Sequence, residues 1–298
     1  MKALILVDME GASGITTDRL SWTRVHTEDW ERFGRDRITA DVAATARGAL
    51  AGGAEAVTVM DMHDTGDSIR PEKLPAGARL VGLGDTLIPF GGIDSQHKIL
   101  LMVGFHAKAV ASLSDPGTAI LPHTVHDPIA DIRYNGRSLG EIGLFAGSFG
   151  ALASPDSAGL AWGLLTGDKA ACDEARDLSA TVEVAAVKER LTDGSERLLD
   201  DAESATLIAE RAEAAVRKAA EKTPLAFQGP IRLEVAFRRP EMTSFELPPY
   251  VDRVDDCTVG LWAPDGFMAL FLFYYLQPHY MPVVKRLKEG SRGLHHPS

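Results

Sequence analysis

Two carboxylates, Asp8 and Glu10, follow directly after a short apolar run at residues 3–7. In an extended backbone, residues two apart point to the same side, so both side chains would face the region beyond the end of that strand. Two carboxylates held together repel each other unless a cation or a shared proton lies between them. The spacing therefore indicates a cation site. The simpler structural interpretation is that Asp8 caps a loop and Glu10 is solvated.

Three further residues of metal-ligand type occupy corresponding places along the chain. His63 and His106 each follow an apolar stretch with strand character, and Glu141 begins a segment with helical character. Each has a structural explanation by itself, because a histidine can cap a turn or lie in a core, and a carboxylate is favoured at a helix N-terminus. Together, carboxylates and imidazoles are the ligands of zinc or a related divalent ion. Five such groups, with carboxylates able to bridge, predict two ions that share Asp8.

The predicted elements bring these residues to one place. A strand at residues 3–7, a helix at 30–50 and a strand at 55–60 form one βαβ unit, and another buried strand follows at 99–103. The carboxyl ends of parallel strands meet at one edge of an open α/β sheet, where ligands bind. We therefore expect the carboxylates and the two histidines to converge at that edge.

The remaining pattern predicts the fold class, which is α/β. We expect a mostly parallel sheet flanked by helices in the N-terminal part and a smaller α+β C-terminal part. Further strands are expected at residues 78–81, 131–134, 160–166, 181–187, 231–237 and 260–263, and helices at 140–152, 169–178, 202–221 and 266–275. Asp168 is predicted to N-cap the helix that follows it. A change of character near residue 200 predicts a metal-binding α/β catalytic domain at 1–200 and a smaller α+β domain at 201–298.

Composition excludes several classes of partner. The formal net charge of -11 argues against nucleic acid and against anionic membrane surfaces, because both need a basic surface. The apolar stretches at residues 3–7 and 266–276 are too short for a signal peptide or a membrane span. Two cysteines, Cys172 and Cys257, make no disulfide framework and no metal knuckle. We expect a cytoplasmic protein that binds neither nucleic acid nor membrane.

Several motifs recur in one order along the chain. They are Val-Asp8-Met-Glu10-Gly-Ala-Ser-Gly, Asp61-Met-His63, Gly-Phe-His106-Ala, His123-Thr124 and Asn-Gly-Arg-Ser-Leu-Gly-Glu141-Ile-Gly. This ordered set resembles the D-aminopeptidase family of zinc metallopeptidases, the bacterial dipeptide-transport-associated enzymes. The resemblance extends from residue 1 to about residue 187 and becomes looser beyond it.

The resemblance implies a role for each residue of the set. The first aspartate, Asp8, would bridge two Zn²⁺ ions, and the ligand set would be completed by Glu10, His63, His106 and Glu141. The family also has a catalytic histidine between the second histidine ligand and the last glutamate. His123 and His126 are both candidates, and we prefer His123 because a threonine follows it, as in the family's His-Ser/Thr pattern.

The resemblance also implies an activity: a metal-dependent aminopeptidase that hydrolyses short free-amine peptides through a metal-bound hydroxide. It further implies a ring-like homo-oligomer, with the C-terminal part shaping the cavity and the oligomer contacts. The family often shows Asp-Ser-His-Gly where this chain has Asp61-Met62-His63-Asp64, so D- or L-specificity stays open. Two alternatives also remain: an amidase acting on an amino-acid amide or metabolite, and a non-catalytic metal-dependent peptide-binding protein. Dinucleotide binding is disfavoured, because the glycines after residue 10 lack the GxGxxG spacing.

Overall fold

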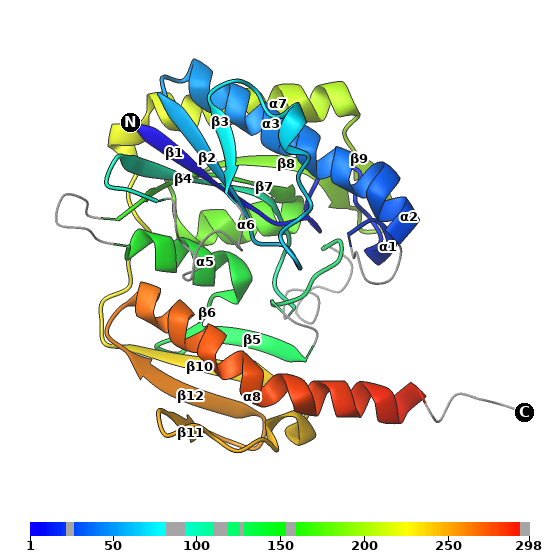
Figure 1. Cartoon of the computed structure of the whole chain (residues 1–298), viewed down its shortest axis with the longest axis vertical. Coiled ribbons are helices and arrows are strands. Elements are labelled where there is room, and N and C mark those ends of the chain that lie inside the picture. Colours follow the sequence, from blue (N-terminus) through cyan, green and yellow to red (C-terminus); the bar gives the residue numbers. More distant parts are fainter. Residues whose placement is uncertain (22–26, 82–92, 110–118, 126–127, 153–158, 293–298) are drawn as a thin grey trace, which may run out of the picture.

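Two β-sheets lie in separate layers, and helices cover the first sheet on both faces (Figure 1). The structure is a computed structural model that describes residues 1–21, 27–81, 93–109, 119–125, 128–152 and 159–292. Within these residues, no helix combines the length and the apolar character that crossing a bilayer requires.

The first sheet has the strand order β3-β2-β1-β4-β7-β8-β9. Its strands are β1 (Lys2–Val7), β2 (Ala56–Asp61), β3 (Ala78–Val81), β4 (His97–Phe105), β7 (Ala161–Asp168), β8 (Glu183–Arg190) and β9 (Glu196–Leu198). Every neighbouring pair is parallel except β8 with β9. The chain builds outward from β1 on one side through β2 and β3, and on the other side through β4, β7 and β8. A sheet of this kind has its topological switch point beside β1.

The apolar run of β1 is buried on both sides of the sheet. Ala3, Ile5 and Val7 pack in the core beneath α3 (Arg35–Ala51) and α7 (Asp201–Arg217). Leu4 and Leu6 point the other way, into the core that contains α5 (Gly140–Gly150) and α6 (Lys169–Leu178). Period-two alternation between two apolar layers explains why the strand has no polar face.

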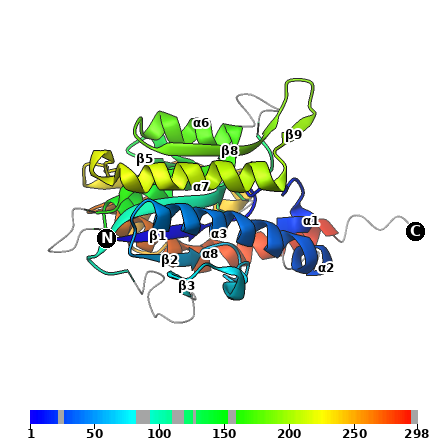
Figure 2. The ribbon, with the colours of Figure 1, turned by 90° about the horizontal axis from the view of Figure 1, so that it is seen from above.

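Helices α3 and α7 lie side by side over one face of the first sheet (Figure 2). Their approach is closest at Gly48, where a Cβ atom would lie 2.2 Å from the carbonyl oxygen of Ala209. No larger residue fits at this point unless the two helices move apart.

The second sheet is antiparallel and has the order β11-β12-β10-β5-β6. Its strands are β5 (Ile129–Tyr134), β6 (Arg137–Ser138), β10 (Ile231–Phe237), β11 (Val251–Arg253) and β12 (Thr258–Ala263). Alternate residues of β10, beginning at Ile231, are buried in the core that contains α5 and α8 (Gly266–Arg292). This core joins the two sheets, so α5 is held from both sides.

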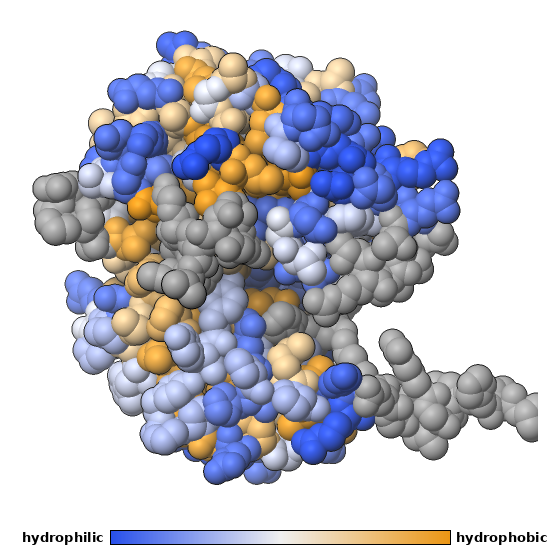
Figure 3. Space-filling model, in the orientation of Figure 1, coloured by the Kyte–Doolittle hydropathy of each residue, from blue (hydrophilic) through white to orange (hydrophobic). Residues whose placement is uncertain are grey.

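Short helices complete the described chain. They are α1 (Asp18–Ser21), α2 (Thr27–Asp29), the π-helix η1 (Trp30–Gly34), and the 3₁₀ segments η2 (Pro71–Lys73), η4 (Ala219–Glu221) and η5 (Pro240–Thr243). On the face shown in Figure 3, hydrophilic residues cover much of the outer surface, and apolar residues gather toward its middle.

The predicted fold class is confirmed, and Asp168 does N-cap α6 by accepting a hydrogen bond from the backbone of Ala171. The prediction for the last helix was too short: α8 continues to Arg292 through Pro278 and Pro282. Both prolines are exposed, while apolar residues on the other side of α8 stay buried, so packing maintains the helix beyond them. The short strands β6, β9 and β11 were not predicted.

The two sheets exchange segments across residue 200. Strands β5 and β6, which precede this residue, belong to the second sheet, and α7, which follows it, covers the first sheet. A division into domains at residue 200 stays a prediction.

Candidate metal centre

The sequence-predicted residues that follow strands β1, β2 and β4 meet at the switch point. Asp8 and Glu10 follow β1, while His63 and His106 follow its two neighbours, β2 and β4. The hydrogen bonding between β1 and β4 extends slightly past the end of β1: the backbone N–H of Asp8 donates to Val103 O at 2.9 Å. The sheet therefore fixes the backbone of Asp8 directly.

Asp8 belongs to two groups of potential metal ligands. One group is Asp8, Glu10 and His63, and the other is Asp8, His106 and Glu141; within each group, one ligand atom per residue lies within 4.8 Å of the others. Four of these residues are almost fully buried, and the Glu141 side chain is 12% exposed. Two three-ligand groups that share one carboxylate are the arrangement expected of two ions bridged by that carboxylate.

Hydrogen bonds orient the imidazoles so that each Nε2 atom faces the carboxylates. His63 Nδ1 lies 3.2 Å from Ser68 Oγ, and Nε2 lies 3.4 Å from Glu10 Oε1. His106 Nδ1 lies 3.0 Å from its neighbour's carbonyl, Ala107 O, and Nε2 lies 3.4 Å from both Asp8 Oδ2 and Glu141 Oε2. An acceptor on Nδ1 selects the tautomer whose Nε2 lone pair can bind a metal.

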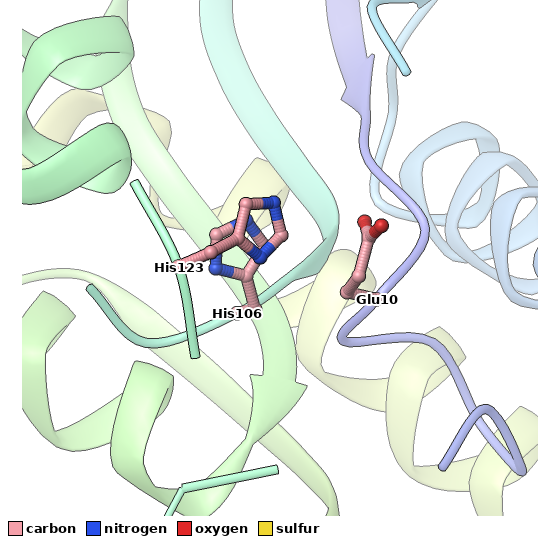
Figure 4. A group of neighbouring side chains, drawn as sticks. All are labelled: Glu10, His106 and His123. Atoms are coloured by element: carbon pink, nitrogen blue, oxygen red, sulfur yellow. The ribbon is translucent and has the colours of Figure 1, made fainter. Parts of the chain in front are cut away.

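His123 lies against the same centre. Its ring stacks on that of His106, with centroids 3.6 Å apart and planes 16° apart. Figure 4 shows both rings facing the carboxylate of Glu10, which forms a third potential ligand group with them. His123 Nδ1 lies 3.1 Å from Leu121 O, so Nε2 is directed away from its own loop.

Glu141 connects the start of α5 to the segment that carries His123. It lies in the first turn of the helix, where the macrodipole favours a carboxylate. Its Oε2 accepts a hydrogen bond from the backbone of Val125 at 2.8 Å. The position of this segment therefore depends on α5, which packs between the two sheets.

Burial and the charges of neighbouring groups together shift the pKa values of the four central groups. Burial opposes a charge on His63, but the neighbouring carboxylate of Glu10 raises its pKa to about 10. Burial likewise opposes a charge on His106, and Asp8 and Glu141 raise its pKa to about 10. Burial and the charge of Glu10 raise the pKa of Asp8 well above its usual value. Burial opposes ionisation of Glu10, yet His63 holds its pKa well below the usual value. Without an ion, protonated imidazoles are the counter-charges of these carboxylates.

The donor set suits divalent metal. Three inward-facing atoms are buried and make no hydrogen bond within the described residues: Asp8 Oδ2, Glu10 Oε2 and His106 Nε2. Buried polar atoms without partners are costly, and cations bound by the two ligand groups would give each of these atoms a partner. Each group offers three nitrogen and oxygen ligands, which leaves a coordination position open, as in catalytic zinc sites.

Asp61 was included in a sequence motif, but no role was assigned to it there. Asp61, at the end of β2, accepts hydrogen bonds from the backbones of His63 at 3.1 Å and Ser68 at 2.6 Å, and so closes the turn that presents His63. A carboxylate two residues before a histidine ligand was the available signal. His126, the alternative catalytic residue, lies outside the described residues.

Buried carboxylates and imidazoles at the switch point of an α/β sheet give this chain the site of a metal-binding protein. The D-aminopeptidase family model matches residues 1–273, and the chain belongs to this family.

A comparison of sequences and a comparison of structures show the same relationship. The D-aminopeptidase of Bacillus subtilis (strain 168) is 30% identical over 228 residues, which are 76% of this chain and 77% of that protein. A solved structure, described as the Zn-dependent D-aminopeptidase DppA from Bacillus subtilis, a self-compartmentalizing protease, has a TM-score of 0.81 and 26% identity. The structural match covers 94% of this chain and 98% of the chain in the solved structure.

Replacing the shared carboxylate should disturb both ligand groups. If each ligand group binds an ion, we expect Asp8→Ala to weaken binding at both groups by more than about 100-fold, since even an outer hydrogen-bond partner contributes 10- to 100-fold. Elemental analysis and chelator-competition titration measure this loss. The control is Asp131→Ala, which removes another buried aspartate, bonded to Arg133 and Ser138 of the second sheet. Retention of both ions by Asp8→Ala would contradict the shared role.

Metal uptake should release protons. In the metal-free protein the pKa of both His63 and His106 is about 10, so both are protonated at neutral pH, whereas a metal binds the neutral imidazole. Affinity should therefore rise with pH, by roughly tenfold per pH unit for each proton displaced. Calorimetry of the metal-free protein between pH 6 and 8, in buffers of different ionisation enthalpy, counts the protons. Heats that do not depend on the buffer would contradict this charge state.

Proposed function

We propose that this chain binds two zinc ions and removes the amino-terminal residue of short peptides. As a member of the D-aminopeptidase family, it is a metal-dependent aminopeptidase. The observation that carries the finer proposal is the sharing of Asp8 by two groups of three ligands. Zinc is proposed because the similar solved structure is described as Zn-dependent and because imidazole and carboxylate ligands suit this ion.

Each proposed ion has its own ligands. Glu10 and His63 would hold the first, His106 and Glu141 the second, and Asp8 both. When bound, zinc lowers the pKa of water toward neutrality and polarises the carbonyl of the scissile bond. The protein supplies a buried surrounding in which these charges act strongly.

His123 is the proposed proton carrier of the reaction. Burial and the neighbouring His106 lower its pKa below the usual value, so at neutral pH it is a base. With Nδ1 held by Leu121 O, its Nε2 can accept a proton from the attacking water and return it to the leaving amine. It comes from a loop rather than from the sheet, which suits a group that meets the substrate instead of forming the floor of the site.

The proposed substrates are short peptides with a free amino terminus and preferably a D-residue there. The stereochemical preference rests on the family and on the relative, which is itself named a D-aminopeptidase. Glu10 and His106 are each 1% exposed and His63 is 7% exposed, so the centre lies too deep for a folded protein chain to reach.

A homo-oligomer that encloses the sites is also proposed. The similar solved structure is described as a self-compartmentalizing protease. In a single copy of this chain, large aromatic side chains are exposed at Trp262 (61%), Tyr275 (57%) and Tyr250 (38%), around the second sheet and α8. Apolar area of this kind favours association between copies.

A substrate panel tests the activity. Metal-analysed protein should hydrolyse free-amine D-dipeptides faster than their L-counterparts and aminoacyl amides, and a chelator should abolish turnover. N-acetylated dipeptides and casein are the controls, and both should be left intact. Efficient cleavage of either control, or full activity after complete removal of metal, would refute the proposed function.

Loss of His123 should affect the chemical step and not metal binding. General acid–base groups contribute on the order of 100- to 10,000-fold, so His123→Ala should lower kcat by this amount and retain both ions. His126→Ala is the comparison, and its kcat should fall much less than that of His123→Ala. A larger fall in kcat for His126→Ala than for His123→Ala would assign the proton-carrier role to His126. Loss of an ion in His123→Ala would instead make His123 a metal ligand.

A further inference from the structure

The loop at residues 10–15 carries Glu10 but receives little support from the sheet. Its last bond to a neighbouring strand is made by the backbone of Gly11, which donates to Gly104 O at 2.7 Å. Beyond it, the backbone N–H groups of Ala12 and Ile15 close turns by donating to Met9 O and Ala12 O, and neither bond reaches a strand of the sheet. A buried carbonyl such as that of Glu10 needs a donor from elsewhere in the molecule.

Lys188 supplies this donor from β8, three strands away from β1 in the sheet order. The residue is 2% exposed, and its Nζ donates to Glu10 O at 2.5 Å and also to Ile15 O. A single ammonium group thus bridges the two ends of the loop. A lysine is seldom buried so deeply without a specific reason.

Two buried carboxylates act with this ammonium. Asp41 Oδ2 accepts a hydrogen bond from the backbone of Ser13 at 2.8 Å, in the middle of the same loop. Asp168 Oδ2 accepts one from the backbone of Ile120 at 2.8 Å, three residues before His123. Both carboxylates favour the charge of Lys188, which burial opposes. Hydrogen bonds to these three buried charged groups therefore hold two segments, one bearing Glu10 and the other bearing His123.

We propose that Lys188 is a positioning residue of the metal centre, which fixes the backbone of Glu10 so that its carboxylate meets His63. Lys188 forms none of the ligand groups itself, and it reaches the centre through the main chain of residues 10 and 15. Asp8 needs no such support because the ladder with β4 already holds its backbone. The effect of Lys188 is therefore confined to one of the two ions. This inference rests on the proposed two-ion function.

The test is a metal titration of Lys188→Met, a change that removes the charge and the donors but keeps most of the side-chain volume. The affinity of one ion should fall 10- to 100-fold, the range for residues that orient ligands, and the affinity of the other should stay unchanged. Zinc competition against a chromogenic chelator gives both dissociation constants without reference to activity. A role in stability alone would weaken neither ion or both equally, and either result would overturn the proposal.

Lys222→Met is the matched control. The side chain of Lys222 is also largely covered, at 5% exposed, and it donates to Thr181 O and to Glu183. It lies in the connection after η4, and its partners lie at the start of β8, the end opposite Lys188. We expect this variant to lose thermal stability and to bind both ions as the original protein does.

Failure of the variant to fold and absence of metal from the original protein can each be told apart from failure of the proposal. If Lys188→Met does not fold, the titration uses Lys188→Gln, which keeps two N–H donors on a shorter side chain without charge. The same selective loss is expected, and unchanged affinity for both ions would overturn the proposal. Absence of stoichiometric metal in the original protein would instead refute the two-ion function itself, which separates the two failures.

Discussion

Confinement of like charges is the constraint on which the rest of this structure depends. Asp8, Glu10 and Glu141 carry carboxylates into a buried region, where neither water nor distance relieves their repulsion. Positive charge must lie among them, from protonated imidazoles in the metal-free protein and from metal ions in the loaded one. The same groups that make the site costly to fold therefore make it a strong cation site.

Both the sheet and the loops hold the carboxylates and imidazoles of the candidate metal centre in position. Asp8 is fixed by the ladder between β1 and β4, and His63 by a turn that Asp61 closes. Glu141 depends on α5, which is packed between both sheets, so the second sheet contributes to the centre without supplying a ligand. The carboxylate that both ligand groups share therefore lies at the rigid edge of the sheet, while His123, the proposed proton carrier, lies on a loop.

Much of this was determined by the sequence alone. Apolar runs that end on Asp8, His63 and His106 indicate buried parallel strands and a polar edge of the sheet. This is possible because a strand that is buried on both faces is apolar at nearly every position. Glu141 was also found from the local sequence, in this case from its place at the start of a predicted helix. The structure brings all of these residues and His123 together, while their roles as ligands and as proton carrier remain predictions.

Other features were decided only by tertiary structure. The pairing of β5 with β10 joins segments about one hundred residues apart, and no local pattern specifies such a partner. Helix α8 passes two prolines because distant residues pack against it. Lys188 and Asp41 have no sequence signature, since a lysine near the end of a strand or an aspartate in a helix is ordinarily solvated. Residue type and spacing thus determined which groups could bind a cation, and long-range packing decided which other groups hold them in place.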